Sequence, residues 1–188
     1  MSSHPVVQPL LSLEEYLALE ERSELRHEYL GGHVHAMSGA SKRHNRIVGN
    51  LYRRLADAAE GGPCRVYIEA VKLRAARDVI YYPDVIVACG PDNGDPLIED
   101  APCLLVEVVS PGTERIDRFE KLLAYRQIPT LLAYLVVEQD ARLVERHWRE
   151  PQGAWQSEVL AGAGKIAVPC PELELSLDEV YARTGVPA

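Results

Sequence analysis

Two carboxylates stand in segments that are otherwise apolar. Asp84 lies in YYPDVIVA and Glu107 lies in LLVEVV, both predicted to be strands. An ionised carboxylate in an apolar strand is costly unless it is paired, hydrogen-bonded or bound to a metal. If the two strands are neighbours, both carboxylates can converge on one point, where they would suit Mg²⁺ or Mn²⁺ with open positions for water and phosphate. The alternative is that each one forms a structural ion pair with Lys or Arg.

Lys121 is the third candidate, on a predicted helix that follows the Glu107 strand. Asp117 and Tyr125 lie four residues to either side of it, on one helix face opposite to Phe119. A short connection would return this helix across the sheet, where the ammonium could orient the attacking water or stabilise charge on a phosphate. The alternative is a solvated lysine that pairs with Asp117.

The first half of the chain holds the elements that would position Asp84. Ser12 and Glu15 form a capping-box signature for a short helix, and HEYL and HVHAM flank Gly31-Gly32 as a hairpin. A helix is predicted over 41–60, and RVYIEAVKLR and DVIYYPDVIVAC are predicted to be two strands. The apolar face of the helix comprises Ile47, Val48, Leu51, Leu55 and Ala58.

The second half holds the elements that would position Glu107 and Lys121. CLLVEVVS reads as a buried central strand, with Cys103, Leu105 and Val109 on the face of Glu107. A long helix should then run to about residue 127, and TLLAYLVV is a further buried strand. The predicted core face of that helix comprises Ile116, Phe119, Leu122 and Leu123. A β-meander is predicted from the three segments RLVERHWRE, AWQSEVLA and KIAVP. A terminal helix is predicted from SLDEVYAR.

Composition bounds the fold class and the partners. The 188 residues, 47% of them hydrophobic and 26% charged, predict a single domain over 1–188 with an α/β fold, of the α+β type with a mixed sheet. The net charge of -8 argues against non-specific coating of DNA. Neither a membrane span nor a signal peptide is visible, so we expect a cytoplasmic protein.

The cysteines are widely spaced. Cys64, Cys89, Cys103 and Cys170 contain no C-x-x-C pair, which argues against a zinc site of the usual spacing. Cys89 and Cys103 sit in or beside apolar runs. Buried, reduced thiols are therefore expected.

Basic residues gather on the helix predicted over 41–60. His44 opens it, and a helix N-terminus with basic neighbours is a natural phosphate site. Arg43, Arg46 and Arg53 are the candidate nucleic-acid contacts, on a polar stripe that also holds Asn50 and Arg54. The alternative for the stripe is a solvated helix face. His27, His33 and His35 could suggest a metal cluster on the hairpin. His33 and His35 point the same way but have no third convergent ligand, so a metal cluster is not expected there.

A proline–aspartate followed by a second acidic strand resembles the PD-(D/E)XK nuclease superfamily. The matching residues are Pro83-Asp84 and Glu107-Val108-Val109, although Val109 stands where the superfamily has its lysine. The chain is similar over nearly its whole length to the Uma2 family of restriction-endonuclease-like proteins, in which the lysine lies on the next helix. The similar segments are HEYLGGHVHAMSGAS, YYPDVIVA and LLVEVVSPGTERIDRFEKLLAYRQIPTLLAYLVV.

The resemblance implies a core of helix, three strands, helix and strand, with an extra N-terminal helix and hairpin and a C-terminal β-meander. It implies Asp84 and Glu107 as metal ligands and Lys121 as the displaced catalytic lysine. A further acid would come from Glu28 or, as the alternative, Glu69; an ordinary strand-surface glutamate is the competing interpretation of each.

The resulting hypothesis is a Mg²⁺- or Mn²⁺-dependent endonuclease acting on nucleic acid, with DNA as the expected partner. A homodimer or higher homo-oligomer is expected through edge strands of the C-terminal meander, with Trp148 and Trp155. One rival is a catalytically inactive binding or assembly module, and another is a metal-dependent hydrolase of a different phosphate substrate.

Overall fold

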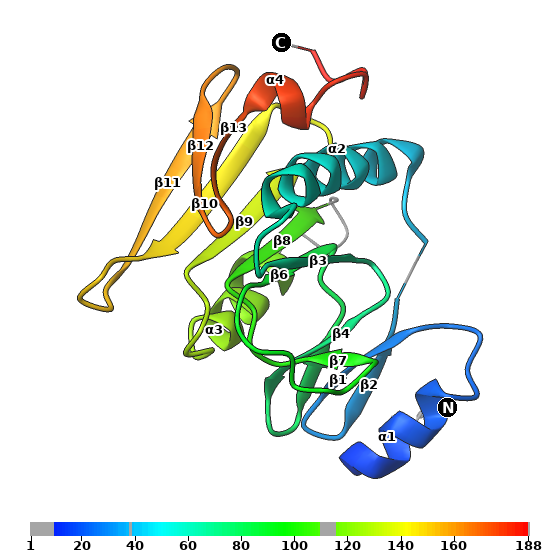
Figure 1. Ribbon diagram of the computed structural model, residues 1–188. Coiled ribbons are helices and arrows are strands. Elements are labelled where there is room, and N and C mark those ends of the chain that lie inside the picture. The colour runs from blue at the N-terminus through cyan, green and yellow to red at the C-terminus, as the bar shows by residue number, and fades with distance from the viewer. Residues whose placement is uncertain (1–9, 38, 110–115, 188) are drawn as a thin grey trace.

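The computed structural model describes residues 10–37, 39–109 and 116–187 (Figure 1). Its helices are α1 (Leu13–Glu20), α2 (Lys42–Ala59), α3 (Leu122–Tyr125) and α4 (Leu177–Val180), and a π-helical segment, η1 (Ile116–Lys121), leads directly into α3. The strands are β1 (His27–Leu30), β2 (His33–Ala36), β3 (Arg65–Ile68), β4 (Lys72–Ala76), β5 (Val79–Tyr81), β6 (Val85–Ala88), β7 (Ile98–Glu99), β8 (Leu104–Val109), β9 (Ala133–Glu138), β10 (Leu143–Arg149), β11 (Trp155–Ala161), β12 (Lys165–Pro169) and β13 (Glu172–Ser176).

Three sheets organise the strands. The central sheet has the order β11-β10-β9-β8-β6-β3, in which β8 and β9 are parallel and the other neighbours are antiparallel. A second sheet has the order β2-β1-β5-β4-β7, and β12 and β13 pair as a separate hairpin. This mixed α/β arrangement confirms the predicted fold class.

Alternation along β8 creates two apolar layers. Leu104, Val106 and Val108 pack on the side of α2, whereas Leu105 and Val109 pack with α3 and the residues that follow it. Helix α2 lies across the central sheet, as Figure 1 shows. Glu107 therefore lies on the side of α3, while Cys103 precedes the strand and packs on the α2 side, contrary to prediction.

The capped segments fold as expected. Ser12 and Glu15 form the capping box of α1, Ser41 caps α2, and β1 pairs with β2 around Gly31-Gly32. The buried residues of α2 are Ile47, Val48, Leu51, Leu55 and Ala59, so Ala59 takes the place predicted for Ala58.

The two long strands predicted around Asp84 are four shorter ones. RVYIEAVKLR divides into β3 and β4, and DVIYYPDVIVAC divides into β5 and β6. Glu69, at the first break, has φ of 56°, the left-handed region that non-glycine residues seldom adopt. The first run thus passes from the central sheet into the second one, and the second run passes back from the second sheet into the central one.

The C-terminal prediction was wrong in its pairing. β10 and β11 form a hairpin that extends the central sheet, but β12 pairs with β13, a strand that the sequence analysis did not predict. The terminal helix is present as α4, capped by Ser176.

The predicted core face of the second long helix was wrong for two of its residues, whereas Leu122 packs against the core as predicted. Phe119 is 65% exposed and Leu123 is 67% exposed, whereas Lys121 is only 5% exposed and Tyr125 is fully buried. The helix therefore turns its lysine and tyrosine toward the sheet.

The cysteines are not the separate reduced thiols that the sequence predicted. Cys64 is joined to Cys89 and Cys103 to Cys170. Within the described ranges, no helix is long and apolar enough to span a membrane.

Candidate active site

A cavity of about 510 Å³ opens between the hairpin, the start of α2 and the central sheet. The acidic residues that line it are Glu28, Glu69, Asp84 and Glu107. The basic residues and histidines that line it include Arg26, His35, His44 and Lys121. Residues that lie far apart in the sequence therefore meet in one concave space, as expected of a ligand site.

Asp84 stands just before β6, beside β8. The pairing of Val85 with Val106 continues so that Asp84 lies opposite Glu107. Asp84 Oδ2 accepts a hydrogen bond from the Val108 backbone N–H at 2.6 Å and lies 3.1 Å from His44 Nε2. Two neighbours thus fix this carboxylate at the cavity wall.

Glu69 extends the same row on the other side of Asp84. β3 runs antiparallel to β6, and the Glu69 N–H donates to the Asp84 carbonyl at 3.3 Å. Three adjacent strands therefore present an acidic residue at the same end of the sheet.

Glu107 lies in a nearly dry environment, with only 4% of its surface exposed. Its Oε1 accepts hydrogen bonds from Lys121 Nζ at 3.0 Å and from the Tyr125 hydroxyl at 2.8 Å. Lys121 Nζ also lies 2.9 Å from Glu28 Oε1. The buried ammonium consequently bridges two carboxylates, one from the central sheet and one from the hairpin.

The electrostatic environment shifts the pKa of two side chains of the site, Tyr125 and His44, upward. Burial, and then the negative charge of Glu107, raises the pKa of Tyr125 well above its usual value, so Tyr125 remains a hydrogen-bond donor. Burial opposes a charge on His44, but the hydrogen bond and charge of Asp84 outweigh it and raise the His44 pKa.

The charges that line the cavity fit a divalent cation. The carboxylates of Glu28, Glu69, Asp84 and Glu107 face two permanent cations, Arg26 and Lys121, which leaves two negative charges uncompensated when His44 is neutral. No three carboxylate or imidazole ligand atoms in the described residues come within 4.8 Å of one another at this end. A cation here would therefore take few direct protein ligands and keep several waters, as Mg²⁺ commonly does.

Comparison with known proteins identifies the family of the chain. The sequence profile of the family described as "Uma2: Putative restriction endonuclease" matches residues 13–179. The chain belongs to the Uma2 family. Two uncharacterised Synechocystis proteins are similar: slr1290 is 33% identical over 175 residues, covering 92% of each chain, and sll1609 is 30% identical over 158 residues, covering 81% of this chain and 89% of its own.

A solved structure shares the fold of this Uma2 chain. The crystal structure of a putative nuclease belonging to DUF820 from Anabaena variabilis superimposes with a TM-score of 0.76 at 19% identity, covering 93% of this chain and 99% of that one. This likeness supports the restriction-endonuclease-like core predicted from the sequence.

Most of the predicted site residues of this Uma2 protein come together. Asp84, Glu107 and Lys121 line the cavity with His44, and so do both alternatives for the further acid, Glu28 and Glu69. Tyr125 reaches the site through Glu107. The side chain of Asp117 lies outside the described residues.

The predicted nucleic-acid contacts do not line the cavity. Arg43 pairs with Asp140, while Arg46 and Arg53 are exposed elsewhere on α2. Asn50 and Arg54, from the same stripe, bind the C-terminal segment through Val180, Ala182 and Glu179. Part of this stripe is therefore a packing surface.

The sequence analysis missed Arg26, Tyr82 and a role for His35 at the cavity. Arg26 Nη1 donates to the Glu69 carbonyl at 2.9 Å and its guanidinium lies 6.0 Å from the Tyr82 ring centre. The position of Arg26 just before the HEYL strand was the available signal. His27 instead lies 2.7 Å from Glu20 Oε1 through its Nδ1 atom.

Proposed function

We propose that this Uma2 protein is a Mg²⁺-dependent endonuclease that hydrolyses phosphodiester bonds in DNA. The observation that carries the proposal is the meeting of Asp84 and Glu107 from adjacent strands with the buried Lys121 in one cavity. Family membership supports a nuclease, and the excess negative charge of the lining supports a cation as cofactor.

Asp84 and Glu107 would hold the cation, since both line the cavity and carboxylate oxygens are the hard ligands that Mg²⁺ prefers. The bound cation supplies Lewis-acid polarisation of a phosphate oxygen. Asp84 is pre-oriented by the Val108 N–H and His44, and Glu107 by Tyr125 and Lys121. These contacts fix the ligand carboxylates before the substrate arrives.

Lys121 would act on the reacting water or on the phosphate. Its ammonium is held between Glu107 and Glu28 at the cavity surface, and it can direct a hydrogen bond toward either group. Preorganised donors of this kind stabilise charge that develops as the P–O bond breaks. His44 and Arg26, from the same lining, are suitable partners for flanking phosphates.

A homodimer belongs to the same proposal. β11 forms one edge of the central sheet, and its Val159 is 62% exposed, so this edge is available for pairing with a second copy. Of the two tryptophans predicted for this surface, Trp148 stacks against Arg146 and Trp155 stacks against Arg149.

The decisive experiment is cleavage of supercoiled plasmid, linear duplex and single-stranded DNA at low salt with Mg²⁺ or Mn²⁺. Wild type, Asp84→Ala and Lys121→Met are compared with Asp57→Asn, which removes an exposed carboxylate on α2 away from the cavity. We expect metal-dependent nicking by wild type and Asp57→Asn, and loss of at least about 100-fold in both site variants.

Two other outcomes would decide against this proposal. Cation binding without cleavage of any nucleic acid would point to a hydrolase of another phosphate substrate. Absence of both binding and cleavage would leave a binding or assembly module, in which the Lys121 bridge between Glu107 and Glu28 serves only to hold the hairpin on the sheet.

A further inference from the structure

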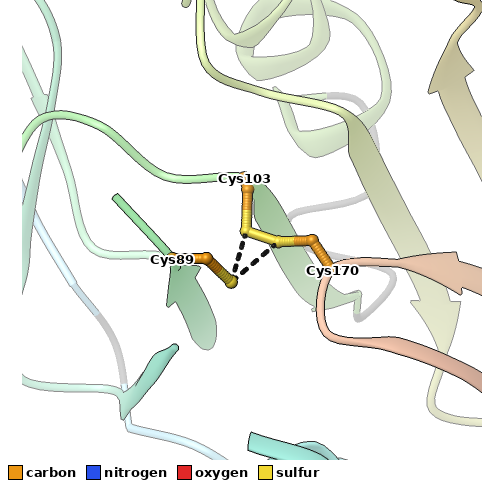
Figure 2. Close-up of side chains that lie close together, drawn as sticks. All are labelled: Cys89, Cys103 and Cys170. Atoms are coloured by element: carbon orange, nitrogen blue, oxygen red, sulfur yellow. Dashed lines mark hydrogen bonds between the residues drawn. A yellow bond between two sulfur atoms is a disulfide. The ribbon is translucent and has the colours of Figure 1, made fainter. Parts of the chain in front are cut away.

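All four cysteines gather at the other end of the central sheet. Cys64 precedes β3, Cys89 follows β6, Cys103 precedes β8 and Cys170 follows β12. Figure 2 shows Cys89 pointing at the Cys103–Cys170 pair. Its Sγ lies 3.4 Å from Cys103 Sγ and 3.5 Å from Cys170 Sγ, and Cys64 is joined to Cys89 itself. Four separate stretches of chain thus deliver their sulfur atoms to one place.

Pairing in disulfides does not explain this convergence. A disulfide requires only that its own two cysteines are adjacent. Two disulfides in one protein therefore do not need to lie in contact with each other. A tetrahedral metal–thiolate centre does require it, because Zn–S bonds of about 2.3 Å put neighbouring sulfurs about 3.8 Å apart. The distances from Cys89 to Cys103 and Cys170 are close to that separation.

The surroundings also suit a structural metal centre. Cys103 and Cys170 are 7% and 6% exposed and belong to the apolar layer under α2, and Cys64 and Cys89 pack against the same layer. Within the described ranges, three ligand atoms from His, Cys, Asp or Glu come within 4.8 Å of one another at the sulfurs of Cys89, Cys103 and Cys170. Soft thiolates select Zn²⁺ over the hard cations expected at the carboxylates.

We propose that the reduced protein binds one Zn²⁺ ion through Cys64, Cys89, Cys103 and Cys170. Each thiol releases its proton to solvent and forms one S–Zn bond, and no electron is transferred. Cys64 and Cys89, neighbours across β3 and β6, separate to occupy two corners of the tetrahedron. With four protein ligands the ion has no open position, so the site is structural.

The ion would fasten the C-terminal hairpin to the central sheet. β12 and β13 form a sheet of their own, and Cys170 lies between them. The other three ligands stand at the ends of β3, β6 and β8. Wide spacing in sequence follows from this arrangement, because each ligand belongs to a different element and no short C-x-x-C loop is needed.

The test uses the full chain, purified without oxygen in a phosphine reductant and a chelator, then freed of chelator and titrated with Co²⁺. We expect about one equivalent of Co²⁺ to give the intense visible bands of tetrahedral thiolate coordination, and Zn²⁺ to abolish them. Calorimetry in buffers of different ionisation enthalpy should show protons released as Zn²⁺ binds. Zinc should also slow alkylation of all four thiols at least tenfold.

Matched variants locate the ion. Asp84→Ala should keep the full cobalt spectrum, and Cys170→Ser should lose or shift it. If the metal-free reduced chain is unfolded by circular dichroism, recovery of the folded spectrum on addition of Zn²⁺ supports the site, and no recovery overturns it. Absence of thiolate bands in folded, fully reduced wild type also overturns it, as do zinc-free disulfides in protein freshly isolated from a reducing cytosol.

Discussion

Three neighbouring strands end in a carboxylate on one side and a cysteine on the other. The pairs are Glu69 and Cys64 around β3, Asp84 and Cys89 around β6, and Glu107 and Cys103 in or beside β8. Because β6 runs antiparallel to both neighbours, the order of acid and cysteine along the chain reverses in β6, yet each kind gathers at one end. The strand length separates the two ends by about 17 Å.

The two ends differ in what surrounds them. The carboxylates line a cavity with arginine, lysine and histidine, whereas the sulfurs lie in or against the apolar layer beneath α2. Carboxylates in a cavity favour a hard cation that exchanges its water ligands and can take part in a reaction. Thiolates packed in an apolar layer favour a soft cation that stays bound and has a structural role. The same strand pairing can therefore position a candidate active site at one end of the strands and a structural cross-link at the other.

The largest expected effect is loss of catalysis at the acidic end. Glu107→Gln keeps the shape of the side chain but removes a negative charge, so the rate of plasmid nicking at saturating Mg²⁺ should fall at least about 100-fold. Single-turnover cleavage measures this, with cobalt binding by the reduced cysteines as the second readout. If nicking and cobalt binding are both lost, the substitution has damaged the whole fold, and the two ends are not independent.

The largest effect at the sulfur end is on stability. In air-oxidised protein, Cys103→Ser removes the bond to Cys170 and should lower the free energy of unfolding in urea by about 2–5 kcal/mol. After full reduction in chelator, wild type and variant should unfold at similar urea concentrations. If the oxidised variant is as stable as oxidised wild type, the Cys103–Cys170 bond does not stabilise the fold, which contradicts the prediction.

Tyr125→Phe sharpens the description of the acidic end. It removes the hydroxyl that donates to Glu107 Oε1 and leaves Lys121 in place, so stability should fall by about 1 kcal/mol and cleavage by a few-fold. Urea unfolding and nicking rates are compared with those of Tyr52→Phe, on the outer side of α2. An effect as large as that of Glu107→Gln would make the tyrosine part of the reaction.

The smallest expected effect lies away from both ends. Phe119→Ser replaces a side chain that is 65% exposed, so the free energy of unfolding should change by less than about 0.5 kcal/mol. Leu131→Ala, at a fully buried position that follows the same helix, should cost about 2–5 kcal/mol. Thermal or urea unfolding of the two variants measures the contrast, and a large effect of Phe119→Ser would indicate a contact with a second copy.

Sequence predicted the acidic end better than the sulfur end because charge in an apolar strand is a local signal. Asp84 and Glu107 stand out from their neighbours, and the lysine spacing after Glu107 connects them to a known family. A cysteine in an apolar run looks like any small core residue. Only strand pairing, together with the separate β12–β13 hairpin, brings Cys64 and Cys170 to the same place.

Errors in the fold have similar causes. The breaks at Glu69 and before Asp84 were missed because both runs keep their β-forming residues, while a left-handed backbone at a glutamate has no sequence signal. Phe119 and Leu123 were assigned to the core by hydrophobicity alone. A buried ion-pair network overrides that rule, since Lys121 and Tyr125 need the inward face to reach Glu107.

The register between β6 and β8 has a consequence for folding. A slip of one residue would turn every side chain of one strand to the opposite face and separate Asp84 from Glu107 and Cys89 from Cys103 in a single step. With ions bound at both ends as proposed, only the correctly aligned sheet gains their binding free energy. Each bound ion would then stabilise the native alignment of the strands relative to a slipped one, in addition to its role in catalysis or in structure.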